Sequence, residues 1–191
     1  MPKLYFRYGA MSSSKTANLL MVAHNYQIQN KKVMLIKPNI DNRFGHSLIK
    51  SRCGLQSKTD YLLEKDDDNL KMIDGEDLYK LDAILVDEAQ FLTEKQINTL
   101  REIANIIPVI CYGLRTDYKT NLFEGSKRLM EIADSIEEIK TTCYFCNKKA
   151  IINFKHRDGK IIKTGNNDVD LGAEEKYLSS CWKCWNEKDS L

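Results

Sequence analysis

The sequence predicts an α/β protein in which helices cover both faces of a mainly parallel sheet and a small cysteine-containing unit follows. Two observations predict this class. Apolar, strand-like segments alternate with segments of helical periodicity over most of the chain. From Thr142 onward, two Cys-x-x-Cys pairs flank a run rich in Lys, Asn, Gly and Asp. We therefore expect two domains, residues 1–142 and residues 143–191.

Hydrophobic patterning gives the elements of the larger domain in chain order. Residues 3–8 alternate apolar and polar side chains before Gly9, which predicts a short strand, and residues 15–29 carry apolar side chains at helical spacing. A second helix is expected over residues 93–107, where TEKQ supplies an N-cap and a polar first turn. Further apolar runs predict buried strands at residues 32–36, 81–86 and 108–112.

Two polar segments predict connections between elements. Asp158 and Gly159 form a dipeptide typical of a tight hairpin turn. The run EKDDD at residues 64–68 is highly charged and has no periodicity, so we expect a solvated loop.

Composition and charge exclude several classes of protein. The chain has 191 residues, is 42% hydrophobic and 29% charged, and carries a net charge of +2. It therefore lacks the basic excess that would indicate nucleic acid as a partner. No run approaches the roughly 18 consecutive apolar residues of a membrane span, and the start MPKLYFRYG lacks a signal core. We expect a cytoplasmic protein without a membrane partner, whose six cysteines serve as thiols or metal ligands.

Residues 9–16 match the phosphate-binding loop pattern G-x(4)-G-K-[S/T], except that Ser14 replaces the second glycine. In such loops the backbone N–H groups surround phosphate, the Lys contacts the distal phosphates and the Thr hydroxyl binds Mg²⁺. If φ is positive at Ser14, the strain costs about 1 kcal/mol and would weaken nucleotide binding. The rival interpretation is a plain turn before a helix. The motif predicts a P-loop NTPase-like domain that binds ATP through Gly9, Ala10, Met11, Ser12, Ser13, Ser14, Lys15 and Thr16.

A second motif, ILVDEAQF, is an apolar strand that ends in two carboxylates. The carboxyl ends of strands are where α/β folds bind ligands. In a P-loop protein Asp87 would support Mg²⁺ with Thr16, and Glu88 would act as the general base. A solvated loop start is the alternative. The string DEAQ also resembles the box of RNA helicases, but those enzymes close two ATPase lobes around nucleotide, and this chain has room for one.

The cysteine pairs predict a metal site. Thirty-four residues separate Cys146 from Cys181, and the four thiolates of Cys143, Cys146, Cys181 and Cys184 can hold Zn²⁺ tetrahedrally. Because such a site has no open coordination position, we expect a structural role. Redox dithiols and unliganded buried cysteines remain the alternatives.

Together GAMSSSKT, DEAQF, YGLRTDY and KYLSSCWKC resemble the type II thymidine kinases over nearly the whole chain. The resemblance implies a P-loop core with a C-terminal zinc-binding lasso domain, assembled as a homotetramer. It also implies transfer of the γ-phosphoryl of ATP to the 5′-hydroxyl of thymidine, a reaction of pyrimidine deoxynucleoside salvage, with Glu88 as the catalytic base and Mg²⁺ accompanying ATP.

The same resemblance assigns further residues to the substrates. On the ATP side they are Asp41, Asn42, Arg43 and Gln90, with Arg43 near the phosphates. Phe91 and Tyr118 would border the thymine, and a lasso loop that ends at Tyr177 would cover it through Asp168, Val169, Asp170, Leu171 and Gly172. For the three aromatic residues the alternative is plain packing. The acidic lasso departs from the apolar residues common in the family, which leaves thymine preference open.

Two rival functions remain at the level of sequence. One is a P-loop ATPase or switch whose zinc hairpin binds nucleic acid or a protein, for which Lys148, Lys149, Lys155 and Arg157 give some support. The other is a nucleoside-binding relic that has lost ATP affinity through Ser14. The sequence also leaves open the nucleoside range and whether thymidine triphosphate is a feedback ligand.

Overall fold

A six-stranded, wholly parallel sheet forms the centre of the larger part of the protein. The computed structural model describes residues 2–39, 47–68, 70, 78–164 and 177–191. The strand order is β5-β2-β6-β7-β1-β8. In chain order these strands are β1 (Leu4–Tyr8), β2 (Val33–Pro38), β5 (Tyr61–Leu63), β6 (Ala83–Val86), β7 (Val109–Gly113) and β8 (Ser135–Glu138).

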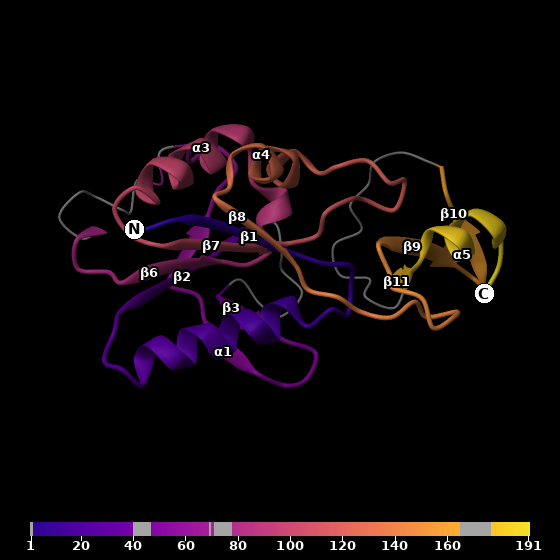
Figure 1. Ribbon diagram of the computed structural model, residues 1–191, viewed down its shortest axis with the longest axis horizontal. Coiled ribbons are helices and arrows are strands. Elements are labelled where there is room, and N and C mark those ends of the chain that lie inside the picture. Colours follow the sequence, from indigo (N-terminus) through magenta and orange to yellow (C-terminus); the bar gives the residue numbers. More distant parts are fainter. Residues whose placement is uncertain (1, 40–46, 69, 71–77, 165–176) are drawn as a thin grey trace.

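Helices cover both faces of this sheet, as the sequence predicts. Helix α1 (Lys15–Gln27) lies against one face, and α3 (Glu94–Ile103) and α4 (Glu124–Ile132) lie against the other (Figure 1). Strand side chains alternate between two apolar clusters, so that Leu35 packs with α1 while Ile36 packs with α3 and α4. The α/β fold class is therefore confirmed.

All six elements expected from patterning are present, with ends shifted by a few residues. Strands β5 and β8, helix α4 and the antiparallel hairpin of β3 (Leu48–Lys50) and β4 (Gln56–Lys58) were not expected. These additional strands are short, and β4 and β8 are largely exposed. Among the described residues no helix is both long and apolar enough to span a membrane.

The cysteine-bearing C-terminal part has its own antiparallel sheet, ordered β10-β9-β11. Its elements are β9 (Ile152–Arg157), β10 (Lys160–Ile162), β11 (Tyr177–Ser180) and α5 (Trp182–Glu187). Asp158 and Gly159, with φ of 51° and 76°, make the expected tight turn between β9 and β10. This part lies beyond the carboxyl ends of the parallel strands (Figure 1). The division at residue 142 stays a prediction.

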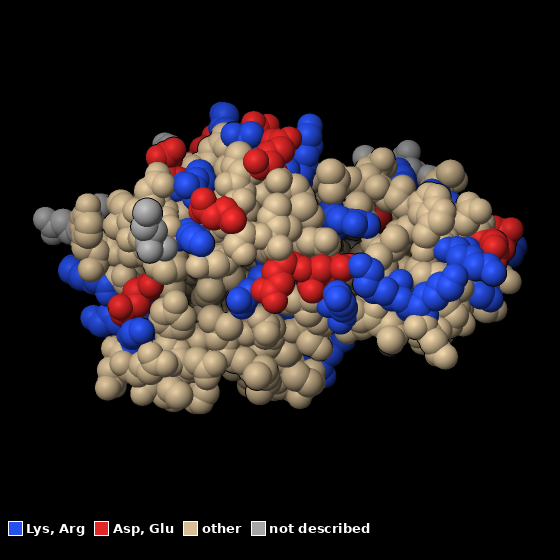
Figure 2. Space-filling model, viewed as in Figure 1, with Lys and Arg blue, Asp and Glu red and all other residues tan. Residues whose placement is uncertain are grey.

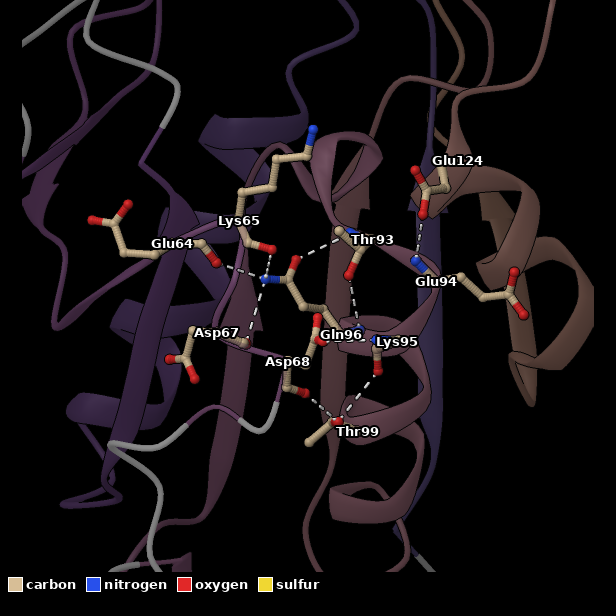
Figure 3. A network of polar contacts seen from close by, with 10 residues as sticks. All are labelled: Glu64, Lys65, Asp67, Asp68, Thr93, Glu94, Lys95, Gln96, Thr99 and Glu124. Atoms are coloured by element: carbon tan, nitrogen blue, oxygen red, sulfur yellow. Dashed lines mark hydrogen bonds and ion pairs between the residues drawn. The ribbon is translucent and has the colours of Figure 1, made fainter.

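The charged run at residues 64–68 is a loop, but the expectation that it is solvated was wrong for Asp67, which is only 7% exposed. The hydroxyl of Tyr61 donates to the Asp67 carboxylate. From α3, the side-chain amide of Gln96 donates to the carbonyl oxygen of Glu64 at 2.7 Å (Figure 3). The charge of this run could not show that Gln96, about 30 residues further along the chain, donates hydrogen bonds to the backbone of the loop.

A 3₁₀ turn, η1 (Ala89–Phe91), follows β6 and begins the connection to α3. Thr93 then caps α3: its hydroxyl accepts from the backbone N–H of Gln96 at 3.2 Å, and the Gln96 side chain accepts in return from the N–H of Thr93 at 3.0 Å. This reciprocal capping box is what the string TEKQ predicts.

Candidate functional site

The loop between β1 and α1 is tightly wound around its first residue. A Cβ added at Gly9 would collide with the carbonyl oxygen of Ile139 and the side chain of Ser13, so glycine is required there. Ser12 and Ser14 have positive φ values of 60° and 63°. Left-handed residues interspersed in a turn direct successive N–H groups toward a common centre, which suits an anion. The loop therefore has the backbone form that the motif predicts.

Ser14 carries the strain that the missing glycine implied. It is the N-cap of α1, it has left-handed backbone angles (φ 63°, ψ 26°), and its side chain makes no capping hydrogen bond. The left-handed conformation costs a residue with a Cβ roughly 1–2 kcal/mol. Its carbonyl oxygen accepts from the backbone N–H of Asn18 at 2.9 Å, which ties Ser14 to the first turn of the helix.

Lys15 folds back over the loop. Its ammonium donates to the carbonyl oxygens of Ala10 at 2.9 Å and Gly9 at 3.3 Å, and to the hydroxyl of Ser13 at 3.4 Å. The positive charge is therefore held at the loop itself, where the distal phosphates of a bound nucleotide would need it.

Thr16 and Asp87 meet at the carboxyl end of β6. The hydroxyl of Thr16 donates to the two carboxylate oxygens of Asp87, at 3.1 and 3.3 Å. Burial, and then the nearby charge of Glu88, raise the pKa of Asp87 to about 7, while the Thr16 hydrogen bond opposes the shift. A hydroxyl and a carboxylate are oxygen ligands of the kind that Mg²⁺ prefers, so the pair fits the predicted metal role.

Glu88, the predicted base, has a strained backbone with φ 52° and ψ 37°. Such strain in a non-glycine residue is common where a side chain is held for function. Its carboxylate accepts from the side-chain amide of Gln90, whose own oxygen accepts from the N–H of Leu114 at 2.9 Å. Gln90 is 1% exposed, so it links Glu88 firmly to the end of β7. Its predicted contact with ATP stays a prediction.

The three predicted base-contacting aromatics lie in different settings. Phe91 packs edge-on against Phe123, with ring centroids 5.6 Å apart. Tyr118 is 7% exposed, and the ammonium of Lys155 lies 5.1 Å from its ring centroid. Tyr177 begins β11 directly opposite Lys155. Tyr118 and Tyr177 thus flank one lysine at the junction of the two parts, whereas Phe91 belongs to a separate aromatic pair.

Contacts across the junction join the C-terminal part to the phosphate loop. The backbone N–H of Met11 donates to the side-chain oxygen of Asn153 at 2.7 Å. Just before the C-terminal part begins, the hydroxyl of Thr141 donates to the carbonyl oxygen of Ser12 at 3.4 Å. Sequence reasoning missed Asn153, which lies 142 residues from its partner in a strand without a motif. The Asn153 contact brings the cysteine-bearing part to the phosphate-loop end of the sheet.

The four predicted cysteines converge. Their sulfur atoms all lie within 4.8 Å of one another, and the sulfur of Cys146 is 3.7 Å from the sulfurs of Cys181 and Cys184. Four thiolates at 2.3 Å from a tetrahedral ion would be about 3.8 Å apart. The cluster could therefore hold a metal ion. Cys53 and Cys111 lie elsewhere, one exposed and one buried.

Two predicted groups lie outside the described residues. The first is Asp41, Asn42 and Arg43, and the second is the lasso segment with Asp168, Val169, Asp170, Leu171 and Gly172. Their proposed contacts with substrate stay predictions.

Comparison with known proteins decides the family. A family model described as thymidine kinase matches residues 2–185. The chain belongs to the thymidine kinase family. Proteins named thymidine kinase from Encephalitozoon cuniculi and Lactiplantibacillus plantarum are 41% and 42% identical to it, over 98% and 95% of this chain and 88% and 94% of theirs. One from Francisella tularensis is 41% identical over 98% of both chains.

The match to the thymidine kinase model covers the phosphate loop, the DEAQ segment and all four cysteines within one span. The two parts of the site therefore belong to one family pattern, as the combined motifs predict. Among solved structures, the Pif1 helicase from Candida albicans aligns with a TM-score of 0.41 and 13% identity, covering 72% of this chain and 36% of that one. A likeness this weak supports no statement about fold or activity.

Proposed function

We propose that this member of the thymidine kinase family transfers the γ-phosphoryl group of ATP to the 5′-hydroxyl of thymidine. One observation carries the proposal: the Thr16–Asp87 pair and the strained Glu88 meet the phosphate loop at one edge of the parallel sheet. That juxtaposition supports the proposal, because phosphates on the loop, a divalent ion on Thr16 and Asp87, and the base Glu88 would then lie side by side.

The reaction needs little covalent help from the protein. The 5′-oxygen bonds to the γ-phosphorus as the bond to the β–γ bridging oxygen breaks, ADP leaves, and Glu88 accepts the hydroxyl proton. Loop N–H groups and Lys15 hold the phosphates, and the predicted role of Arg43 is to offset their charge. Thr16 and Asp87 would hold Mg²⁺, which when bound neutralises phosphate charge and fixes phosphate geometry.

The raised pKa of Asp87 fits this role. Near neutral pH it costs free energy to keep a buried carboxylate charged when no cation is close to it. A divalent ion would stabilise the charged form of Asp87 in place of the water that burial removes. Gln90 would keep Glu88 aimed in one direction while the proton moves, because both ends of its amide are bonded within the protein.

The substrate-covering role falls to residues 143–191, which we propose as a separate lasso domain stapled by Zn²⁺ at Cys143, Cys146, Cys181 and Cys184. Four thiolates favour zinc over harder ions, and a closed tetrahedral site has no position left for catalysis. Tyr118 and Tyr177 at the junction, and Phe91 from η1, are the proposed thymine neighbours. Closure of the lasso would exclude water from the reacting phosphate.

The decisive experiment measures ADP formation with and without thymidine, for the wild type, Glu88→Gln and the matched control Glu102→Gln on the exposed side of α3. We expect thymidine-dependent turnover that falls by about 10²–10⁴-fold in Glu88→Gln and is unchanged in Glu102→Gln. Equal ATP turnover in the absence of any nucleoside would contradict a kinase function.

The rival nucleic-acid function gains little from the structure. Lys and Arg side chains are frequent over the C-terminal part (Figure 2). Of the four basic residues considered above, however, Lys155 is buried against Tyr118, and Lys149 pairs with Glu138 at 2.5 Å. RNA- or DNA-stimulated hydrolysis with strong salt dependence would be needed to favour it.

Assembly as a homotetramer in the cytoplasm is the family expectation that we adopt. Exposed apolar side chains on or just after α1 support an assembly, since Met21 and Ile28 are 57% and 64% exposed. Sedimentation equilibrium would test the subunit count. Titration with thymidine triphosphate would show whether it acts as a feedback ligand.

A further inference from the structure

The tip of the β3–β4 hairpin reaches the phosphate loop. Arg52 lies at this tip, and its guanidinium donates to the hydroxyl of Ser12, the loop residue with φ of 60°. Arg52 is itself exposed to solvent. A second cationic side chain besides Lys15 therefore lies at the mouth of the loop, contributed by a segment 40 residues away.

The hairpin is anchored, so the position of its tip is set by the fold. Ile49 in β3 is 1% exposed and packs into the apolar cluster beneath α1. The buried ammonium of Lys37 donates to the carbonyl oxygen of Leu48 at 3.1 Å. At the tip, the N–H of Ser51 donates to the carbonyl oxygen of Leu55 at 2.8 Å, closing the turn that presents Arg52.

The hydroxyl of Ser12, one of the partners of Arg52, is a weak acceptor compared with a phosphate oxygen. A neutral hydroxyl accepts a hydrogen bond from a guanidinium less strongly than a phosphate does, and guanidinium groups can bind two phosphate oxygens at once in a bidentate geometry. ATP carries several negative charges, and Lys15 is the single cation inside the described loop. Phosphate oxygens beside Ser12 would outcompete its hydroxyl for Arg52.

We propose that Arg52 is a phosphate-contacting residue of this kinase, which exchanges the Ser12 hydroxyl for phosphate oxygens of ATP when the nucleotide binds. The inference rests on the proposed function, since it takes ATP as the ligand of the loop. It adds a specific cation from the hairpin tip to the loop residues and Arg43.

Kinetics with three variants test the role. We expect Arg52→Gln to lower kcat/KM for ATP by about 10- to 100-fold, the loss of one charged hydrogen bond, with KM for thymidine within about twofold. Arg52→Lys should recover part of the loss. Lys58→Gln, the same charge change on an exposed residue of β4, should leave both constants unaltered. An Arg52→Gln enzyme indistinguishable from Lys58→Gln overturns the proposal.

A binding measurement separates failure of this inference from failure of the proposed function. Calorimetry with Mg²⁺ and a non-hydrolysable ATP analogue needs no turnover, so it applies even if the wild type phosphorylates no nucleoside. Arg52→Gln should weaken the analogue about tenfold or more while leaving adenosine unaffected, because adenosine has no phosphate to contact. Equal weakening of both ligands, or of neither, contradicts a phosphate contact.

Discussion

At the scale of single residues, the departure at Ser14 is the feature that most affects the phosphate loop. Its left-handed backbone is natural for glycine and strained for serine. Ser14→Gly should therefore raise the free energy of unfolding by about 0.5–1 kcal/mol, measured by urea denaturation at equilibrium. Affinity for ATP should rise only a few-fold. A gain of several hundredfold would instead favour the nucleoside-binding relic.

Ser13 supplies the matched control for this prediction. It is a neighbouring loop serine that is 4% exposed and is absent from the residues with positive φ. Ser13→Gly should lower stability, because it loosens a backbone that has no need of glycine and removes a hydroxyl that accepts from Lys15. Similar gains in both variants would show that strain at Ser14 is not the cause.

Asp134 is the residue whose charge state should give stability a measurable pH dependence. The N–H of Leu4 donates to its carboxylate at 2.8 Å, and this bond, followed by the ion pair with Arg101, lowers the pKa of Asp134. A lowered pKa stabilises the fold above the unfolded value near 3.8. This contribution is lost as pH falls through the folded value.

Asp134→Ala should therefore lower the free energy of unfolding by about 1 kcal/mol at pH 7, a modest figure because the group is a third exposed. The difference in free energy of unfolding between the variant and the wild type, measured for both proteins at each pH, should shrink below about pH 4. Arg101→Gln should cost less, since the bond to Leu4 remains. A gap that stays constant down to pH 3 would contradict the assignment.

At the scale of elements, the sequence predicts what is encoded locally. β2, β6 and β7 are short, mainly apolar runs, and TEKQ specifies the cap of α3 within four residues. β8, with sequence SIEE, carries no comparable pattern, because it lies at the sheet edge and is largely exposed. Its position is set by pairing with β1, which no local signal shows.

Gln96 tests how far the start of α3 depends on a distant loop. Its side chain completes the capping box and also donates to the backbone of the 64–68 loop, and it is 2% exposed (Figure 3). Gln96→Ala should lower the free energy of unfolding by about 2–3 kcal/mol, because the variant loses both its part of the capping box and the buried amide that ties the backbone of the 64–68 loop to α3. Thr93→Ala, which removes the cap alone, should cost about 1 kcal/mol. Equal losses in urea denaturation would mean that the loop bonds contribute nothing.

In the candidate site, too, groups within one sequence motif can be predicted from the sequence, whereas contacts between distant segments cannot. The phosphate loop, the Asp87–Glu88 pair and the cysteines are contiguous or regularly spaced motifs, and in the structure Thr16 contacts Asp87 and the four cysteines lie together. Asn153 and Arg52 reach the loop from 142 and 40 residues away, from segments with no motif. Tertiary packing alone produces such contacts, so one sequence cannot show them.

At the scale of the whole molecule, the proposed metal site should control the junction between the two parts. The cysteine cluster fixes the start of α5, and Trp185 of that helix donates to the carbonyl oxygen of Tyr118 at 3.2 Å. Without metal, four thiols in contact have no ion to hold them together, and so small a sheet buries too little apolar surface to persist alone. Loss of metal should therefore release the C-terminal part while the parallel sheet remains.

The tryptophans make this prediction measurable, because the protein has two and both, Trp182 and Trp185, lie in α5. After removal of metal with a strong chelator, Trp fluorescence should shift to longer wavelength, whereas far-UV circular dichroism should keep most of its signal. Thymidine-dependent activity should be lost, and addition of Zn²⁺ under reducing conditions should restore both activity and fluorescence. Cys143→Ser should reproduce the metal-free state, with Cys53→Ser as the control thiol outside the cluster. If the far-UV circular dichroism signal were lost together with the fluorescence shift, the metal would hold the entire fold, because the parallel sheet would then lack stability of its own.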